Sequence, residues 1–101
     1  MFHRIVRMEF VPERSNEFES FVKTITNKIA NFEGCFGVRI LRESDNGNVF
    51  FTYSYWRSKE DLENYRKSDL FRQIWPKTKE MFAKPAKAWT TEVVDFKKKR
   101  T

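Results

Sequence analysis

The sequence predicts an α+β domain in which four antiparallel strands and two helical regions follow one another as strand, helix, strand, strand, helix, strand. Three observations lead to this order. Apolar residues recur at every second position near the start of the chain, a helical apolar stripe follows, and an Asn-Gly pair at 46–47 then separates two strand-like runs. The 101 residues form one domain, because a chain of this length has room for a single core.

The first two elements are a strand over Phe2–Val11 and a helix over Glu13–Phe32. The strand is indicated by apolar side chains at every second position, namely Val6, Met8 and Phe10. Pro12 ends it. The helix has one continuous apolar stripe, formed by Phe18, Phe21, Val22, Ile25, Ile29 and Phe32. Gly34 follows at the place where many helices end in the left-handed conformation.

A hairpin is predicted for the middle of the chain, with strands over Cys35–Ser44 and Val49–Trp56. The second of these strands is apolar on both faces. One face carries Phe51, Tyr53 and Tyr55, and the other carries Phe50 and Trp56. Because the helices of such a fold cover only one face of the sheet, we expect a second copy of the chain to cover the other face in a symmetric dimer.

The second helical region is broken in two, and each part begins at a predicted N-cap serine, Ser58 or Ser68. The first part buries Leu62 and Tyr65, and the second carries Leu70, Phe71, Ile74, Trp75, Thr78, Met81 and Phe82. Pro76 predicts a kink or a shifted boundary. Ala88–Phe96 is the last strand. The simplest compact form of this order is the ferredoxin-like fold, an antiparallel sheet with helices on one face.

The net charge of +6 is concentrated at the C-terminus. Residues 97–100 supply four of the twenty basic side chains, which leaves 16 basic against 14 acidic residues elsewhere. We therefore divide the chain into a domain over residues 1–96 and a basic tail over residues 97–101, which we expect to be disordered. The nearly neutral body argues against a nucleic-acid partner. No apolar run approaches the roughly 20 residues of a transmembrane helix, so no membrane partner is expected.

The composition also limits cofactors and compartment. One histidine and one cysteine cannot form a His/Cys metal cluster, and the glycine-rich phosphate-binding motifs are absent. We expect neither a metal nor another cofactor. Cys35 has no partner for an internal disulfide, and the N-terminus has no signal-peptide core, which together predict a cytoplasmic protein.

Two segments carry a recognisable pattern. One is the turn Glu33-Gly34-Cys35, and the other is the run Phe50-x-x-Tyr53-x-x-Trp56-x-Ser58-x-x-x-Leu62-x-x-Tyr65-x-x-Ser68-x-x-Phe71. Together they resemble a recurring signature of the antibiotic biosynthesis monooxygenase family, and the resemblance spans residues 2 to 96. It implies a dimeric α+β barrel, in which two ferredoxin-like subunits place their sheets face to face. It also implies a pocket in each subunit between the sheet and the helices.

The resemblance implies a reaction as well: the oxidation of an electron-rich ring, such as a quinol or an anthrone, by molecular oxygen without a cofactor. A deprotonated ring of this kind can itself pass an electron to oxygen. The protein then has to bind the ring, lower its pKa and stabilise the oxyanion. We therefore predict a cofactor-independent monooxygenase that acts on a small aromatic molecule.

Eight side chains are candidates for this site. Tyr65 and Trp75 resemble pocket positions of the family, and each can donate a hydrogen bond to a developing phenolate. His3 is the only side chain whose ordinary pKa suits a base near neutrality. We assign these three to catalysis, and we assign to the substrate pocket Val6, Arg39, Tyr53, Trp56 and Phe71.

Two other functions remain open. A haem-degrading branch of the same superfamily has an asparagine, a tryptophan and an iron-binding histidine where this chain has Val6, Tyr65 and Trp75. Haem degradation is the weaker alternative, because an indole does not ligate iron as an imidazole does. The other alternative is a non-catalytic dimer that binds a small aromatic ligand or takes part in a stress response, since a fold does not fix a function.

Overall fold

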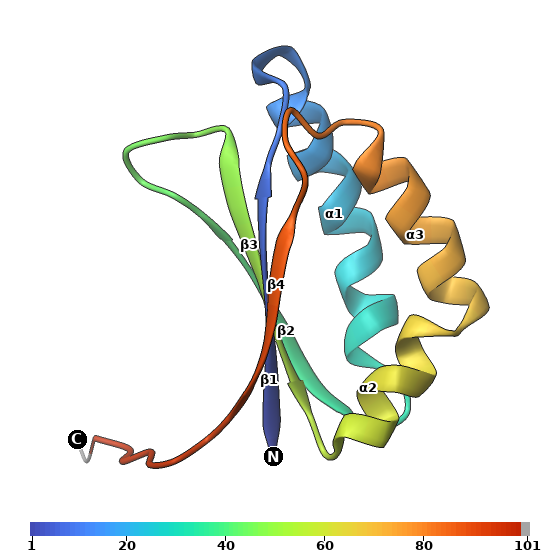
Figure 1. The fold of residues 1–101 in the computed structure, drawn as a ribbon, viewed down its shortest axis with the longest axis vertical. Helices are drawn as coiled ribbons and strands as arrows, with labels where there is room; N and C mark the ends of the chain where they lie inside the picture. Colours follow the sequence, from blue (N-terminus) through green and yellow to red (C-terminus); the bar gives the residue numbers. More distant parts are fainter. Residues whose placement is uncertain (100–101) are drawn as a thin grey trace.

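The computed structural model describes residues 1–99 and confirms the predicted order of elements (Figure 1). The strands are β1 (Phe2–Glu9), β2 (Cys35–Arg42), β3 (Val49–Trp56) and β4 (Lys87–Glu92). The helices are η1 (Pro12–Arg14), α1 (Ser15–Ala30), α2 (Lys59–Arg66) and α3 (Asp69–Lys79). Neighbouring strands are antiparallel, and their order in the sheet is β2-β3-β1-β4. This is the ferredoxin-like α+β fold that the sequence predicts.

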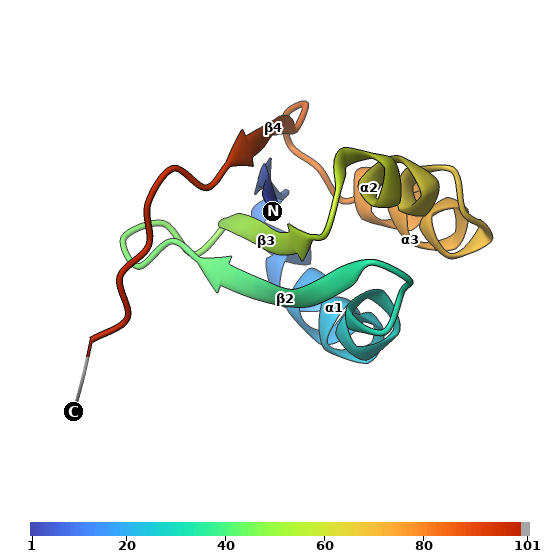
Figure 2. The same cartoon turned by 90° about the horizontal axis from the view of Figure 1, so that it is seen from below.

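The molecule has two layers, with α1, α2 and α3 on one face of the sheet and, among residues 1–99, no helix on the other (Figures 1 and 2). The core fills the space between the layers. Its buried side chains are Met8, Phe10, Phe18, Val22, Ile25, Ile29, Phe50, Trp56, Leu62, Tyr65, Ile74 and Met81. The predicted stripe of the first helix supplies four of them. Burial of each large apolar side chain contributes about 1.5–3 kcal/mol, so this layer contact is the main stabilising interaction.

The two predicted N-cap serines lie at the starts of α2 and α3. The Oγ atom of Ser58 accepts a hydrogen bond from the backbone N–H of Asp61 at 3.0 Å. The Oγ atom of Ser68 accepts one from the N–H of Phe71 at 3.1 Å. Both serines are therefore N-caps. Gly34 follows α1 with a φ of +82°, a conformation in which a side chain would be strained.

Gly34 also makes room for a polar cluster at the start of α2. A Cβ atom at position 34 would overlap the Asp61 side chain. The Asp61 carboxylate accepts hydrogen bonds from Arg57 Nε at 2.9 Å, from Arg57 Nη2 at 3.0 Å and from Ser58 Oγ at 2.8 Å. The bonds from Arg57 and then from Ser58 hold the pKa of Asp61 below its ordinary value. The Glu33-Gly34-Cys35 turn is therefore explained by packing against α2.

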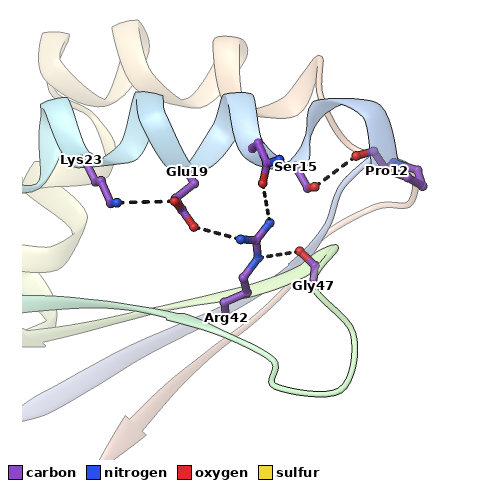
Figure 3. A network of polar contacts seen from close by, with 7 residues as sticks. Pro12, Ser15, Glu19, Lys23, Arg42 and Gly47 are labelled. Carbon is purple, nitrogen blue, oxygen red and sulfur yellow. Dashed lines mark hydrogen bonds and ion pairs between the residues drawn. The ribbon is translucent and has the colours of Figure 1, made fainter.

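Arg42, at the end of β2, joins the hairpin turn to α1 (Figure 3). Its guanidinium donates to the Gly47 carbonyl oxygen at 2.7 Å, to Asn16 Oδ1 at 3.1 Å and to Glu19 Oε1 at 2.9 Å. The same group lies 4.7 Å from the centre of the Phe50 ring. Arg42 therefore closes one end of the core on the α1 side.

Four predicted elements extend past the observed ends. The helix predicted over Glu13–Phe32 is α1 over Ser15–Ala30, and the strand predicted over Cys35–Ser44 ends at Arg42. For the other two, side-chain packing continues where the regular hydrogen bonding stops. The first strand ends at Glu9, and α3 passes through Pro76 and ends at Lys79. Phe10 and Phe82, which the sequence placed inside these elements, instead form an isolated β-bridge. Their ring centres lie 5.4 Å apart. Apolar periodicity alone does not distinguish such a packed connection from a helix or a strand.

The last strand is also shorter than predicted and ends at Glu92 instead of Phe96. After it, the chain leaves the sheet (Figures 1 and 2). Val94 is 96% exposed and Phe96 is 77% exposed. Residues 97–99 of the basic tail are exposed as well, and the last two residues of the tail lie outside the described range. Among residues 1–99, no helix is both long enough and apolar enough to cross a membrane.

Candidate functional site

An apolar cavity of about 220 Å³ lies between the helix-covered face of the sheet and the helices. Val6 and Ala88 line it from the sheet, and Leu62, Phe71 and Trp75 line it from α2 and α3. A dry cavity of roughly 150 Å³ in a protein core is enough to bind benzene. The cavity therefore has room for a ligand of one ring or of two fused rings.

Strand pairing decides which side chains reach the cavity. Val6 on β1 lies opposite Thr52 on β3, and both line the cavity. The next pair is Ile5 opposite Tyr53. Because neighbouring side chains of a strand point to opposite faces, Ile5 and Tyr53 belong to the face without helices, which we call the open face.

Tyr65 on α2 is buried in a cluster of aromatic rings. It stacks on Trp56 with ring centres 5.2 Å apart, and it meets Phe32 and Phe71 edge to face at 5.4 and 5.3 Å. Its hydroxyl has no hydrogen-bond partner within residues 1–99 and is not fully enclosed, and Tyr65 is one of the residues that line the cavity. Burial, with a lesser contribution from Cys35, raises the pKa of Tyr65. The hydroxyl therefore keeps its proton and serves as a donor.

Trp75 on α3 supplies a second donor. Its indole stacks on Phe71 with ring centres 5.7 Å apart and meets Phe82 edge to face at 5.6 Å. Its Nε1–H has no acceptor within residues 1–99, and the ring is only partly buried. Tyr65 and Trp75, each of which carries one polar hydrogen, thus line the same apolar cavity.

Four of the eight predicted site residues line the cavity, namely Val6, Tyr65, Phe71 and Trp75. Trp56 lies against Tyr65 but is fully buried. Its indole N–H donates to Ser54 Oγ at 2.8 Å, so this donor is used inside the core. Trp56 supports the position of Tyr65 without facing the cavity.

The other three predicted residues lie on the open face. His3 contacts Tyr55, with ring centres 4.0 Å apart, and Tyr53, at 5.9 Å. Arg39 on β2 lies opposite Tyr53 and so points to the same face. The sheet separates these side chains from the cavity. His3 and the two aromatic donors therefore do not form one cluster within the subunit.

Two arginines that the sequence analysis did not single out also line the cavity. Arg4 comes from β1, is half-buried, and donates from Nη1 to Thr90 Oγ1 at 2.9 Å. Arg66 ends α2 and pairs with Glu63 at 3.2 Å. Burial lowers the pKa of Arg4, and the charge of Arg66 acts in the same direction. The sequence could have predicted this position of Arg4. Arg4 and Val6 are two residues apart on the first strand, so their side chains point to the same face of the sheet.

The lining residues that the structure describes include no carboxylate and no imidazole. Their ionisable side chains are Arg4, Tyr65 and Arg66. The cavity can therefore bind an aromatic ring, donate hydrogen bonds and stabilise negative charge. It offers no side chain that would act as a general base near neutrality.

Solved structures of other proteins share this fold. A conserved protein from Methanosarcina mazei matches with a TM-score of 0.83 at 23% identity, over 90% of this chain and 91% of its own. A candidate antibiotic biosynthesis monooxygenase from Nitrosomonas europaea matches with a TM-score of 0.87 at 15% identity, over 94% and 100%. Another from Bordetella bronchiseptica gives 0.82 at 21% identity, over 92% and 96%. At these identities the likeness shows the fold alone.

The family of the chain is established by comparison of its sequence with family models. Comparison with curated protein sequences finds no match. The family model described as antibiotic biosynthesis monooxygenase matches residues 1–76, which include the first three strands, all the helices up to Pro76 and both cavity donors. The chain therefore belongs to the antibiotic biosynthesis monooxygenase family, as the signature around the hairpin and the second helical region predicted.

Proposed function

We propose that this protein is a cofactor-independent monooxygenase that oxidises a small, electron-rich aromatic compound of one or two rings with molecular oxygen. One observation carries the proposal: Tyr65 and Trp75 line a single apolar cavity, and their hydrogen-bond donors have no acceptor within residues 1–99. Family membership supports the class of reaction. The volume of the cavity, about 220 Å³, supports a ligand smaller than a three-ring anthrone.

The chemistry follows from stabilising an aromatic oxyanion. The ionised ring passes an electron to O2, and the two radicals combine at a ring carbon. The resulting peroxide anion takes up a proton, and the hydroperoxide then loses water, with the hydrogen of the same carbon, to leave a carbonyl. One oxygen atom thus enters the substrate and the other leaves as water. Donors aimed at the ring oxygen from Tyr65 and Trp75 favour the anion that starts this sequence, and the apolar lining strengthens them by excluding water.

Association through the open face is the second part of the proposal. This face carries His3, Ile5, Tyr53, Tyr55 and Trp89. Trp89 is 46% exposed, which is unusual for so large an apolar side chain. A homodimer that buries the two open faces against each other would remove this patch from water. We assign His3, Tyr53 and Arg39 to this interface, on the side of the sheet away from the cavity.

Oxygen uptake tests the proposed reaction. The substrates are benzene-1,4-diol, naphthalene-1,4-diol and anthrone, each corrected for its uptake in buffer. We expect turnover with the one- or two-ring quinols, and we expect Tyr65→Phe and Trp75→Phe each to lower kcat by about 100-fold, as loss of one oxyanion donor does elsewhere. The matched controls are Tyr55→Phe and Trp89→Phe, which make the same chemical changes on the open face.

Two results would contradict the reaction. If uptake with wild-type protein equals uptake in buffer for all three compounds, the protein is not a monooxygenase for this class. The non-catalytic alternative, a dimer that binds a small aromatic ligand, would then be favoured. If the cavity variants and the open-face variants keep the same rate as the wild type, the reaction does not take place in this cavity.

A further inference from the structure

We propose that the cavity selects aromatic ligands that carry a negative charge, as a carboxylate or an ionised phenol, and that Arg4 and Arg66 hold the charged group. This names the substrate class of the site described above. It rests on the proposed function only for the statement that the bound ring is then oxidised.

Both guanidinium groups come from the same end of the molecule. Arg4 lies near the start of β1, and Arg66 is the last residue of α2, which lies at the end of the sheet where the chain begins (Figure 1). Both side chains line the cavity, whose other lining residues are mostly aliphatic and aromatic. A ring bound in this cavity would therefore meet positive charge at one end and apolar side chains elsewhere.

Of the two arginines, Arg4 gives the stronger support for an anionic ligand. It is half-buried, and its one side-chain hydrogen bond within residues 1–99 is to the hydroxyl of Thr90. No ion pair in that range includes Arg4, although eleven other pairs occur. A guanidinium has five donor hydrogens, so most of those on Arg4 remain available to an acceptor in the cavity.

Arg66 is only partly satisfied by the protein. Its Nη1 donates to Glu63 at 3.2 Å, while Nε and Nη2 make no hydrogen bond within the described residues. Arg66 and Arg4 also repel each other, which contributes to the lowered pKa of Arg4. A bound anion would remove this repulsion and accept charge-assisted hydrogen bonds from both groups.

The lack of a general base in the lining also favours a ligand that is already negatively charged. With no carboxylate or imidazole in the lining, the cavity has no side chain to take a proton from a neutral phenol at neutral pH. A ligand that arrives already ionised needs no such base, and a phenol whose pKa is lowered by two neighbouring cations can lose its proton to water. The two arginines therefore favour the ionised form of the ligand by electrostatic attraction, in place of a general base that would remove its proton.

A pair of ligands that differ only in charge tests the inference. The probes are 2-naphthoate and its neutral carboxamide, 2-naphthamide, and their affinities are measured by isothermal titration calorimetry. We expect the wild-type protein to bind the acid at least about tenfold more tightly than the amide, which is the effect of a charge-assisted hydrogen bond. In Arg4→Gln and in Arg66→Gln this preference should fall to about twofold or less.

The matched control is Arg72→Gln. Arg72 is an exposed arginine on α3 that pairs with Asp69 and does not line the cavity. This variant should keep the full preference for the acid. Circular dichroism verifies that each variant folds. If Arg4→Gln does not fold, Arg4→Lys replaces it, and the loss of the planar fork should lower the preference at least threefold.

Three results would overturn the inference: equal affinity of the wild type for the acid and the amide, no binding of the acid at millimolar concentration, or an unchanged preference in the Arg4 variants. A titration of bound 2-naphthol separates the two kinds of anion. A lowered pKa of the bound naphthol means that the arginines hold the ionised hydroxyl, and an unchanged pKa means that they hold a separate acid group. A protein that binds the acid through Arg4 but consumes no oxygen would refute the monooxygenase and leave this inference intact.

Discussion

The same strands contribute side chains to both faces of the sheet, and the two faces differ in how deeply these side chains are buried. On the helix-covered face, Trp56, Met8 and Phe50 are between 0% and 2% exposed and pack against the helices. On the open face, Tyr53 and Tyr55 are half-buried within the subunit, and Trp89 is 46% exposed. Chain-adjacent residues such as Tyr55 and Trp56 thus belong to different surfaces. The helix-covered face forms the core and the cavity, and we propose that the open face forms the contact between subunits.

The first way to sharpen this comparison is to truncate those two neighbours. Trp56→Ala should lower the free energy of unfolding by about 4 kcal/mol, because it leaves a large cavity in the core and removes the hydrogen bond to Ser54. Tyr55→Ala should lower the stability of the isolated subunit by about 1 kcal/mol. Urea denaturation at low protein concentration measures both. Similar losses for the two variants would contradict the separation of the faces.

The second prediction concerns the two glycines on either side of the start of β2. Gly34→Ala should cost about 3 kcal/mol, since it strains a residue at φ +82° and displaces Asp61 from its partners. Gly37→Ala should cost only about 1 kcal/mol: a φ of +156° strains an alanine, but a Cβ atom there meets nothing within 4 Å. Thermal and urea denaturation compare the pair. An Ala at position 34 that costs no more than an Ala at position 37 would show that the Asp61 cluster is not rigid.

A charge on the open face should break the proposed dimer without unfolding the subunit. Tyr53→Glu is expected to weaken self-association by about 2 kcal/mol, or about 30-fold in the dimer Kd. Arg72→Glu, on the outside of α3, should leave the Kd unchanged. Sedimentation velocity over a range of protein concentrations gives both values. A wild-type protein that remains monomeric at high micromolar concentration would refute the proposed interface.

The smallest effect is a dependence of stability on pH that comes from Asp61. Hydrogen bonds from Arg57 and Ser58 place its pKa in the folded protein below its pKa in the unfolded chain. The unfolded chain therefore binds the proton more readily, so this stabilisation is complete above about pH 4 and is lost as the pH falls through the folded-state pKa.

Comparison with Asp61→Asn isolates this contribution. The variant should be less stable than the wild type at neutral pH, and the difference should shrink as the pH is lowered toward about 2. Urea denaturation at several pH values provides the measurement. A difference that stays constant over this range would mean that the carboxylate does not carry the effect.

Local signals in the sequence predicted the fold well. Ser58, Ser68, Gly34 and the Asn46-Gly47 turn act on residues a few positions away, so their structural effect can be interpreted without knowing the rest of the molecule. The apolar stripe of the first helix was likewise sufficient to predict its buried face. The signals failed at Phe10 and Phe82, where a long-range β-bridge, invisible in the local pattern, ends the regular elements.

The site was harder to predict because it depends on pairing between distant strands. Tyr65 and Trp75 were assigned to the site and do line the cavity. Tyr53 was assigned to the same pocket as Val6, but the observed register puts the two on opposite faces of the sheet. Which face each side chain of a strand points to is fixed only by the register with its partner strand. Arg4 was overlooked because a charged residue near a terminus is usually solvated, and its half-buried position follows from β4 lying against β1.

The three tryptophans allow the most direct test of the account, because each occupies a different place: Trp75 lines the cavity, Trp56 is hydrogen-bonded in the core, and Trp89 lies on the open face. Their indole N–H signals can be followed by NMR while 2-naphthoate is added, with Trp→Phe variants for assignment. We expect the Trp75 signal to shift most and the Trp89 signal to stay in place. A titration that moves Trp89 and leaves Trp75 unchanged would contradict the assignment of ligand binding to the helix-covered face.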